Sequence, residues 1–204
     1  MRVLPTTLPG LVLVEPPVFA DARGYFYESW NAARHAAAGI AGPFVQDNVS
    51  YSTRGVVRGL HFQRAPRAQG KLVSVLRGAV FDVAVDLRTG SPTFGRWEGV
   101  ELTADNRRQL YVPPGFAHGF AVLSDDALVA YKCTEYYDPS SEVTVRWDDP
   151  AIAVRWPSVA PARLSARDAA APLLADISPA CLPSIGDANL APGPSPAVPY
   201  RPDA

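Results

Sequence analysis

Hydrophobic residues in this chain occur in short runs, many of them alternating with polar residues, and Gly or Pro separates one run from the next. Alternation with period two and enrichment in β-branched residues predict strands. The predicted strands are Leu11–Val14, Lys71–Leu76, Ala79–Leu87, Gln109–Val112, Ala127–Cys133 and Val143–Trp147. Many short strands with little helix indicate a mainly β protein, an antiparallel sandwich or a jelly-roll barrel.

The segment from Lys71 to Leu87 predicts two strands with a tight connection at Arg77-Gly78. The second strand alternates with period two, so its side chains divide between two faces. One face holds Phe81, Val83, Val85 and Leu87, and the other holds Val80, Asp82, Ala84 and Asp86.

Two short helices are also predicted. The first covers Ser29–Ala38, with Ser29 as its N-cap and Gly39 as its stop signal. The second lies near Ser165–Leu174.

The length of 204 residues suits one domain with a tail. We predict a jelly-roll domain over residues 1–182. Residues 183–204 are rich in Pro and Ala and hold few side chains able to fill a core, so we expect an extended or mobile tail there.

The charge balance narrows the possible functions. Lys and Arg number 19 against 20 Asp and Glu, which argues against a nucleic-acid binder. No apolar run is long enough to span a membrane, and the first residues do not resemble a secretion signal. Only Cys133 and Cys181 are present, too few for a disulfide scaffold. We therefore expect a soluble cytoplasmic protein.

The three histidines have different contexts. His35 lies in the Ala-rich helical segment and is predicted to be a surface or packing residue. His61 lies in RGLHFQ, and His118 lies in VPPGFAHGF, whose PxGxxH spacing resembles the second half-motif of the cupin superfamily. Many cupins bind a metal through further His and carboxylate ligands, but Gln63 stands where a second ligand would be. Two histidines are fewer than a catalytic zinc site needs, so we predict no metal.

Without a metal, the histidines are available as a base and a hydrogen-bond donor. Asp82, Asp86 and Asp168 are candidate carboxylates to orient the base. Tyr131 is a candidate acid, although its position also suits an ordinary strand aromatic.

Other residues suit an anionic or aromatic ligand. Arg23, Arg58 and Lys71 could bind diphosphate oxygens or a developing oxyanion, or be solvated surface charges. The aromatic candidates for stacking on a base, which could instead fill the barrel, are Phe19, Phe26, Tyr136 and Tyr137.

Seven blocks between Leu11 and Leu174 resemble the dTDP-4-dehydrorhamnose 3,5-epimerase family and its close sugar-nucleotide epimerase relatives, in family order and at compatible spacings. The blocks are FADARGYFYESW, FVQDNVSYS, GVVRGLHFQ, QGKLVSVLRGAVFDVAVDLRTGSPTFG, QLYVPPGFAHGFAVLS, YKCTEYYDPSSE and WDDPAIAVRWP, with LSARD after them. The resemblance implies an antiparallel jelly-roll (cupin-like) barrel with a few short helices and no cofactor. It also implies a homodimer that exchanges N-terminal strands. The implied substrate is dTDP-4-dehydro-6-deoxy-α-D-glucose, inverted at C3 and C5 to dTDP-4-dehydro-β-L-rhamnose.

The resemblance also implies roles for matched residues. His61 resembles the base that removes the proton next to the C4 ketone, Asp168 its paired carboxylate, and Tyr131 the acid on the opposite face. Lys71 is similar to the lysine beside the C4 oxygen. Arg58 and His118 resemble ligands of the diphosphate and sugar. The residues matched to the nucleotide site are Arg23, Glu28, Gln46, Asp47, Asn48 and Glu142, with Tyr137 stacked on thymine. Phe26 and Arg167 complete the predicted substrate-binding set.

One departure is Arg167, which stands where a lysine is expected before the paired aspartate; its charge is the same, but its donor geometry differs. Three alternatives compete with the 3,5-epimerase. They are an epimerase that inverts only C3 or only C5, a metal-dependent cupin such as a dioxygenase, and a non-catalytic sugar-nucleotide binding module.

Overall fold

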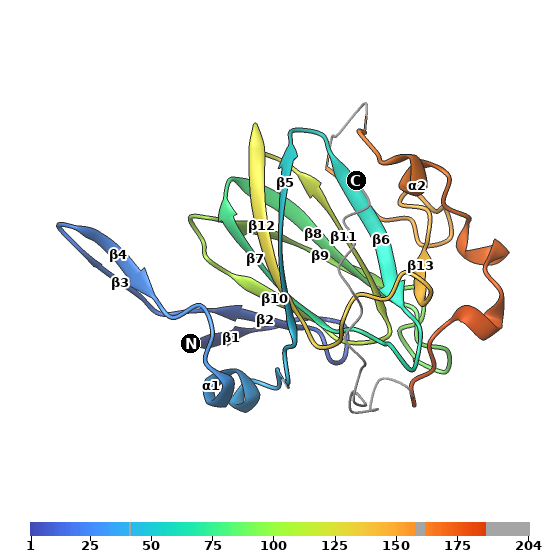
Figure 1. Ribbon diagram of the computed structural model, residues 1–204, viewed down its shortest axis with the longest axis horizontal. Coiled ribbons are helices and arrows are strands. Elements are labelled where there is room, and N and C mark those ends of the chain that lie inside the picture. Colours follow the sequence, from blue (N-terminus) through green and yellow to red (C-terminus); the bar gives the residue numbers. More distant parts are fainter. Residues whose placement is uncertain (41, 158–161, 187–204) are drawn as a thin grey trace.

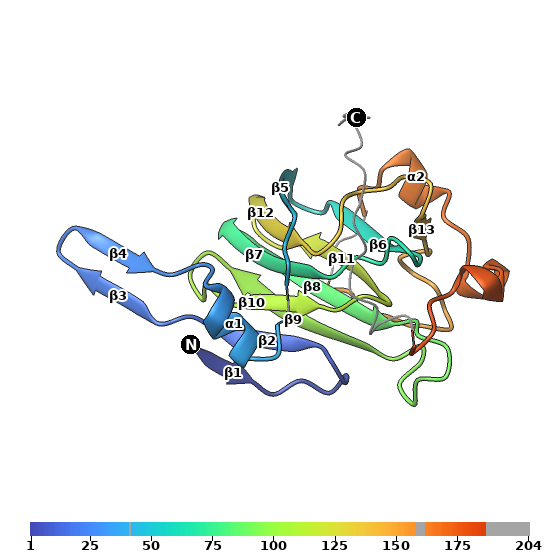
Figure 2. The same cartoon turned by 60° about the horizontal axis from the view of Figure 1, so that its bottom comes forward.

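The computed structural model describes residues 1–40, 42–157 and 162–186, which form two antiparallel sheets packed face to face (Figures 1 and 2). The six-stranded sheet has the order β1 (Arg2–Leu4), β2 (Val12–Glu15), β10 (Gln109–Val112), β7 (Lys71–Arg77), β12 (Asp126–Cys133) and β5 (Gln46–Thr53). The five-stranded sheet has the order β13 (Glu142–Thr144), β6 (Val57–Gln63), β11 (Phe116–Val122), β8 (Ala79–Asp86) and β9 (Trp97–Thr103). A separate hairpin of β3 (Val18–Asp21) and β4 (Gly24–Tyr27) projects from this body.

All the predicted strands are present, and most end within one residue of the expected position. The exception is the last predicted strand, which ends at Thr144 rather than Trp147. Val145 still exchanges backbone hydrogen bonds with Leu60, but the Arg146 N–H donates to the carbonyl of Pro172 instead. The chain therefore leaves the sheet edge at this point.

The tight connection at Arg77-Gly78 joins two strands that do not pair with each other. β7 belongs to the six-stranded sheet and β8 to the five-stranded sheet, so the connection carries the chain from one layer to the other. Gly78 has a φ of +76°, and a Cβ at this position would lie 2.0 Å from the carbonyl oxygen of Asp126. The turn therefore requires glycine both for its conformation and for space.

The two predicted helices are present but shorter than expected. α1 covers Ala32–Ala37, and its N-cap is Asn31, whose side chain accepts the Arg34 N–H at 3.1 Å. The prediction of Ser29 as N-cap is therefore wrong. Gly39 follows the helix with a φ of +84°, as expected of a stop. α2 covers Ala166–Ala169, capped by Ser165. The rest of that segment includes the 3₁₀ helices Leu174–Asp176 and Pro179–Cys181.

Both faces of the five-stranded sheet are covered. One core lies between the sheets and includes Val73, Val80 and Ala84. A second core lies on the other face of β8 and packs Val83 and Val85 against segments from the C-terminal third of the chain. The alternation predicted for β8 is confirmed, and it places the Asp82 side of the strand toward the barrel interior.

The C-terminal region continues past residue 182. The Thr89 N–H donates to the carbonyl of Pro183 at 2.8 Å, so the predicted tail begins in contact with the barrel. Residues 187–204, most of that tail, lie outside the described residues. No helix within the described ranges is both long and apolar enough to cross a membrane.

The turn after β8 is organised by Asp86, which is fully buried. Its carboxylate accepts hydrogen bonds from the Arg88 guanidinium at 2.8–2.9 Å and from the hydroxyls of Ser91 and Thr93, both at 2.6 Å. Burial alone raises the pKa of Asp86, but these hydrogen bonds outweigh it and lower the pKa to about 2. The carboxylate form therefore stabilises the fold.

We predict that Asp86→Asn lowers the free energy of unfolding by ~3 kcal/mol, because it leaves the Arg88 charge buried without its partner. The contribution of Asp86 is present above the ordinary carboxyl pKa of 3.8 and is lost as the pH falls toward 2. Urea unfolding at several pH values tests this, with the exposed Asp105→Asn as the matched control. Equal stabilities of the two variants at neutral pH would contradict the prediction.

Candidate active site

Polar side chains line the barrel interior between β5 and β12 on one sheet and β6, β11 and β13 on the other. Residues paired across an antiparallel sheet share a face, so the register identifies the inward side chains. Tyr131 pairs with Asn48 and with Val73, and Val73 is buried in the core between the sheets. The inward set therefore includes Gln46, Asn48, Lys71, Tyr131 and Cys133 on the six-stranded sheet. His61, Gln63, His118, Glu142 and Thr144 form the corresponding set on the five-stranded sheet.

His61 and Asp168 form a close pair in this interior. Asp168 lies on α2, where the Ser165 cap accepts its backbone N–H, and its side chain is almost completely buried. The Nε2 of His61 lies 2.6 Å from Oδ1 of Asp168. Burial alone raises the pKa of Asp168, but the hydrogen bond and charge of His61 outweigh it, and the pKa lies below the ordinary value. Since the carboxylate accepts, Nε2 carries a hydrogen, and in the neutral ring Nδ1 is then the nitrogen with the lone pair.

The other two candidate carboxylates have different partners. Asp82 is fully buried on β8, and both of its oxygens lie 3.0 Å from Nε2 of His118. Asp86 belongs to the Arg88 turn and does not contact a histidine. The structure thus pairs each inward histidine with its own carboxylate, which orients both rings. His35 is buried on α1 beside Trp30 and bonded to Gln109, and the prediction of a packing role is confirmed.

Lys71 and Tyr131 lie on the wall opposite His61. Lys71 pairs with Cys133 across β7 and β12, and Tyr131 lies two residues before Cys133. Burial lowers the pKa of Lys71, an effect opposed by the nearby Cys133, Glu142 and Asp82. Burial also disfavours the charged form of Cys133. It raises the pKa of this thiol to about 11, so the thiol stays protonated near neutral pH. Lys71 faces the interior, so it is not a solvated surface charge. Tyr131 packs against the core between the sheets, so its position still suits an ordinary strand aromatic as well as an acid.

Glu142 joins residues from three parts of the chain. It lies on β13 and forms an ion pair with the Arg167 guanidinium on α2. Its Oε2 also accepts the hydroxyl of Tyr137 at 2.7 Å. The pKa of Tyr137 is raised, first by burial and then by Glu142. Gln46 accepts the Tyr137 N–H at 2.9 Å and donates to Asn48 at 3.0 Å, so these two predicted residues join the same network.

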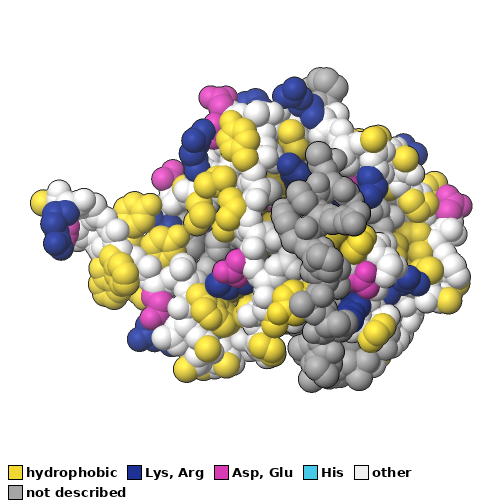
Figure 3. Space-filling model, in the orientation of Figure 1, with side chains coloured by type: hydrophobic (Ala, Val, Ile, Leu, Met, Phe, Trp, Pro, Cys, Tyr) yellow, Lys and Arg dark blue, Asp and Glu magenta, His cyan; other side chains and the backbone are white. Residues whose placement is uncertain are grey.

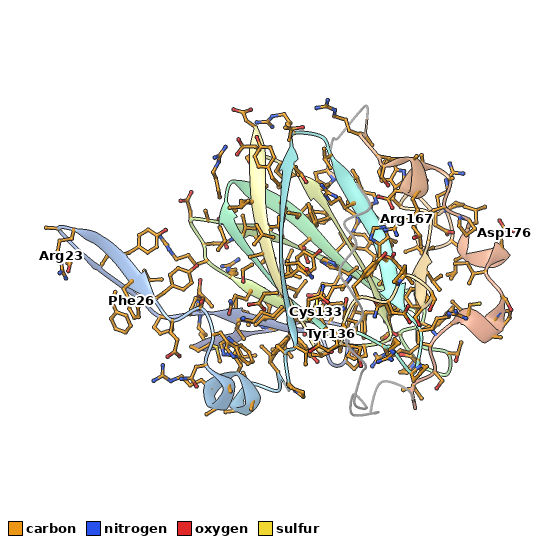
Figure 4. All side chains as sticks on the ribbon, viewed as in Figure 1. Arg23, Phe26, Cys133, Tyr136, Arg167 and Asp176 are labelled. Atoms are coloured by element: carbon orange, nitrogen blue, oxygen red, sulfur yellow. The ribbon has the colours of Figure 1, made fainter. Side chains whose placement is uncertain are left out.

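Some predicted residues lie elsewhere in this chain. Asp47 lies on the opposite face of β5 from Gln46 and pairs with Lys132 at 2.8 Å. Glu28 pairs with Arg34 near α1. Figure 4 shows Arg23 and Phe26 on the projecting hairpin, far from Tyr136 and Arg167. Arg58 lies on β6, where its guanidinium donates to Ser52 at 3.0 Å and to the carbonyl of Tyr51.

The donor set of this interior suits hydrogen bonding better than metal binding. The side-chain amide of Gln63 makes three hydrogen bonds to backbone groups, and each inward histidine is held by a carboxylate. No group of three or more His, Cys, Asp or Glu side chains in the described part of the chain is placed to hold a metal ion. A reaction without metal stays a prediction.

Sequence reasoning did not identify the partners that hold the site together. Ser165 was a detectable signal, because a Ser three residues before an acidic residue is typical of a helix N-terminus. Gln63 and Ser52 offered no such signal, because their partners are backbone groups of two loops for Gln63 and a side chain of the other sheet for Ser52.

Comparisons with known proteins agree with this geometry. The family described as dTDP-4-dehydrorhamnose 3,5-epimerase matches residues 5–176. The dTDP-4-dehydrorhamnose 3,5-epimerase of Salmonella typhimurium is 54% identical over 175 residues, covering 85% of this chain and 96% of that protein.

Two solved structures are similar over almost their whole length. The dTDP-6-deoxy-D-glucose-3,5-epimerase of Legionella pneumophila Philadelphia 1, in complex with dTDP-4-keto-L-rhamnose, has a TM-score of 0.87 and 52% identity. The match covers 90% of this chain and 97% of that one. A 4-keto-6-deoxy sugar epimerase from the novobiocin biosynthetic gene cluster of Streptomyces spheroides has a TM-score of 0.87 and 43% identity, covering 92% and 95%. The predicted cupin-like antiparallel fold is thereby confirmed.

Proposed function

The chain belongs to the dTDP-4-dehydrorhamnose 3,5-epimerase family, and we propose that it inverts C3 and C5 of dTDP-4-dehydro-6-deoxy-α-D-glucose to give dTDP-4-dehydro-β-L-rhamnose. It is thus an isomerase of dTDP-L-rhamnose biosynthesis. The observation that carries the proposal is the buried His61–Asp168 pair facing Tyr131 and Lys71 across the barrel.

His61 acts as the base in this proposal. Nε2 donates to Asp168, so Nδ1 is the atom that takes the proton from the carbon next to the C4 ketone. Asp168 fixes the ring orientation and stabilises the imidazolium that forms. The C–H electron pair moves onto the C4 oxygen as an enolate.

Lys71 is suited to stabilise that oxygen. Its ammonium group lies on the opposite wall within a low-dielectric interior, where a fixed positive charge interacts strongly with a developing oxyanion. Because burial lowers its pKa, the charge is lost at a lower pH than for a solvated lysine. The nearby carboxylates Asp82 and Glu142 favour the charged form.

Tyr131 supplies the returning proton. It faces inward from β12, whereas His61 faces inward from β6 of the other sheet. A sugar ring held between the sheets therefore has the base on one face and the acid on the other. Each inversion leaves one proton on His61 and removes one from Tyr131, and exchange with solvent restores both. The C3 and C5 carbons flank the same C4 carbonyl, so one site serves both in turn.

The nucleotide and diphosphate provide binding energy away from the reacting carbons. In this proposal Arg58 and His118, which lie on the same sheet as His61, contact the diphosphate and the sugar. Tyr137, with Glu142 and Arg167 at its hydroxyl, presents a partly exposed ring on which a thymine base can stack.

The direct test is incubation of the protein with dTDP-4-dehydro-6-deoxyglucose in D2O, in metal-free buffer containing EDTA. We expect deuterium at both C3 and C5 by NMR, and an L-sugar that a downstream reductase traps. Deuterium at one carbon only would indicate a single-centre epimerase. Activity that requires an added metal would support a metal-dependent cupin, and no exchange would support a binding module.

Two variants separate the roles of base and acid. His61→Ala is expected to lower turnover by about 10²–10⁴-fold, with little change in stability, because the base is lost. Tyr131→Phe is expected to retain some deuterium exchange but to lose inversion, because the carbanion is then reprotonated from the His61 side. Wild-type inversion rates in Tyr131→Phe, or full activity in His61→Ala, would contradict these assignments. Circular dichroism and melting temperatures control for folding.

We also propose that the protein is a homodimer in which the β3–β4 hairpin reaches the partner's site. Three large side chains of the hairpin are exposed: Phe19 at 64%, Tyr25 at 57% and Phe26 at 68%. Apolar side chains are also exposed on the outer face of the six-stranded sheet, at Val49 and Tyr51 of β5. Figure 3 shows hydrophobic side chains along the hairpin and on the adjoining face of the body. A second copy would cover both surfaces.

In this dimer Arg23 and Phe26 reach the active site of the partner subunit, although they lie far from the site of their own chain. Arg23 would contact the anionic nucleotide there. Contacts of Glu28 and Asp47 with the nucleotide also remain predictions, and they belong to this dimer proposal. A cytoplasmic location also stays a prediction.

Subunit complementation tests the exchanged hairpin. His61→Ala and Phe26→Ala are each expected to be weakly active as purified dimers. Mixing and re-equilibrating them should restore about a quarter of the wild-type activity, because half the dimers are then mixed and each holds one intact site. Phe26→Ala with full activity, or a mixture no more active than its components, would contradict the exchange.

A further inference from the structure

Gln63 lies on β6, two residues after His61, and only 4% of it is exposed. All three of its side-chain hydrogen bonds go to backbone groups of two loops. Its Nε2 donates to the carbonyls of Arg67 at 2.7 Å and Tyr136 at 3.1 Å, and its Oε1 accepts the Asp138 N–H at 2.9 Å. The amide therefore has both of its hydrogens and its oxygen engaged.

Two of these bonds, with one from Gln46, surround Tyr137. The peptide group before Tyr137 has its carbonyl, from Tyr136, bonded to Gln63 and its N–H bonded to Gln46 at 2.9 Å. The peptide group after Tyr137 has its N–H, from Asp138, bonded to Gln63. Because a peptide group is planar, fixing the planes on both sides of a Cα fixes its φ and ψ. The backbone of Tyr137 is thus held by side chains from both sheets.

The direction of the Tyr137 side chain follows from that backbone. Its hydroxyl reaches Glu142, which is held in turn by Arg167. Its ring stays partly exposed, with 43% of the residue accessible. A ring anchored at its hydroxyl and its backbone, with an open surface, is preorganised for stacking on a planar ligand.

We propose that Gln63 is a positioning residue for nucleotide binding, which acts by holding Tyr137 in the orientation that stacks on the base. This inference rests on the proposed function, since it requires a thymine nucleotide at Tyr137. It also gives a reason for an amide at this strand position: the amide donates to Tyr136 and accepts from Asp138, which neither a carboxylate nor an ammonium group can do.

The experiment compares Gln63→Met with wild type. Met has a similar length but cannot hydrogen-bond to the loop carbonyls. The measurements are the dissociation constant of dTDP and that of inorganic pyrophosphate by calorimetry, and the kcat and KM of the epimerisation. We expect dTDP to bind about tenfold more weakly and KM to rise, as for the loss of a stacked base, with pyrophosphate binding and kcat little changed.

Gln109→Met is the matched control. Gln109 is also a buried glutamine whose amide is fully engaged, with Ser29, Ser74 and His35, but it lies on the outer face of the six-stranded sheet. We expect Gln109→Met to lower the melting temperature without changing the dTDP affinity. A purely structural Gln63 would behave in the same way, and that result would overturn the inference.

A double-mutant cycle with Tyr137→Ala tests whether Gln63 acts through the ring. We expect Gln63→Met to weaken dTDP binding much less in the Tyr137→Ala background than in wild type. Additive losses would overturn the inference, as would unchanged dTDP binding in Tyr137→Ala. If the wild-type protein does not bind dTDP at all, the proposed function itself is contradicted. Failure of the proposed function is thus distinguished from failure of the inference about Gln63.

Discussion

The hydrogen bond between His61 and Asp168 connects an inner strand of the barrel to a segment more than one hundred residues later in the chain. Asp168 can reach the interior because the C-terminal third packs on the outer face of the same sheet, through the core that includes Val83 and Val85. Just before α2, the backbone of Arg163 bonds to Gly55 and Val57 at the start of β6, and the Ser165 cap then sets the turn that carries Asp168. The outer layer is therefore part of the site.

The interior holds charged groups that would be costly to bury alone. Most have a specific partner: Asp168 has His61, Asp82 has His118, and Glu142 has Arg167. Lys71 is balanced by the nearby carboxylates Glu142 and Asp82, which favour its charged form. A pure apolar core fills the rest of the space between the sheets, where Val73 and Val80 lie. The apolar and the polar side chains thus occupy separate parts of the interior, and the proposed site lies in the polar part.

The six predicted strands could be found from the sequence because alternation is a local signal, although the described residues form thirteen strands. The pairing of strands could not: Lys71–Leu87 has the pattern of two adjacent strands, yet Gly78 passes the chain between sheets. The same limit applied to the site. The residues by themselves left three candidate carboxylates for the base, and the family resemblance selected Asp168 among them. The structure adds contacts that neither supplied, such as the Ser165 cap under Asp168 and the pairing of Asp82 with His118.

The barrel architecture itself suits an inversion. An epimerase needs a base and an acid on opposite faces of one ring, and two facing sheets provide opposite walls whose inward side chains are fixed by strand register. His61 and Tyr131 face inward from β6 and β12, on opposite walls, as their proposed roles of base and acid require. Arg167 also fixes the geometry of its neighbours. Its guanidinium reaches two oxygens of Glu142 at once, where an ammonium would act as a single point charge, so the arginine restricts Glu142 and, through it, the Tyr137 hydroxyl. In the proposed function, this arginine therefore holds the end of the site assigned to the nucleotide, while the reacting end depends on the two opposed walls.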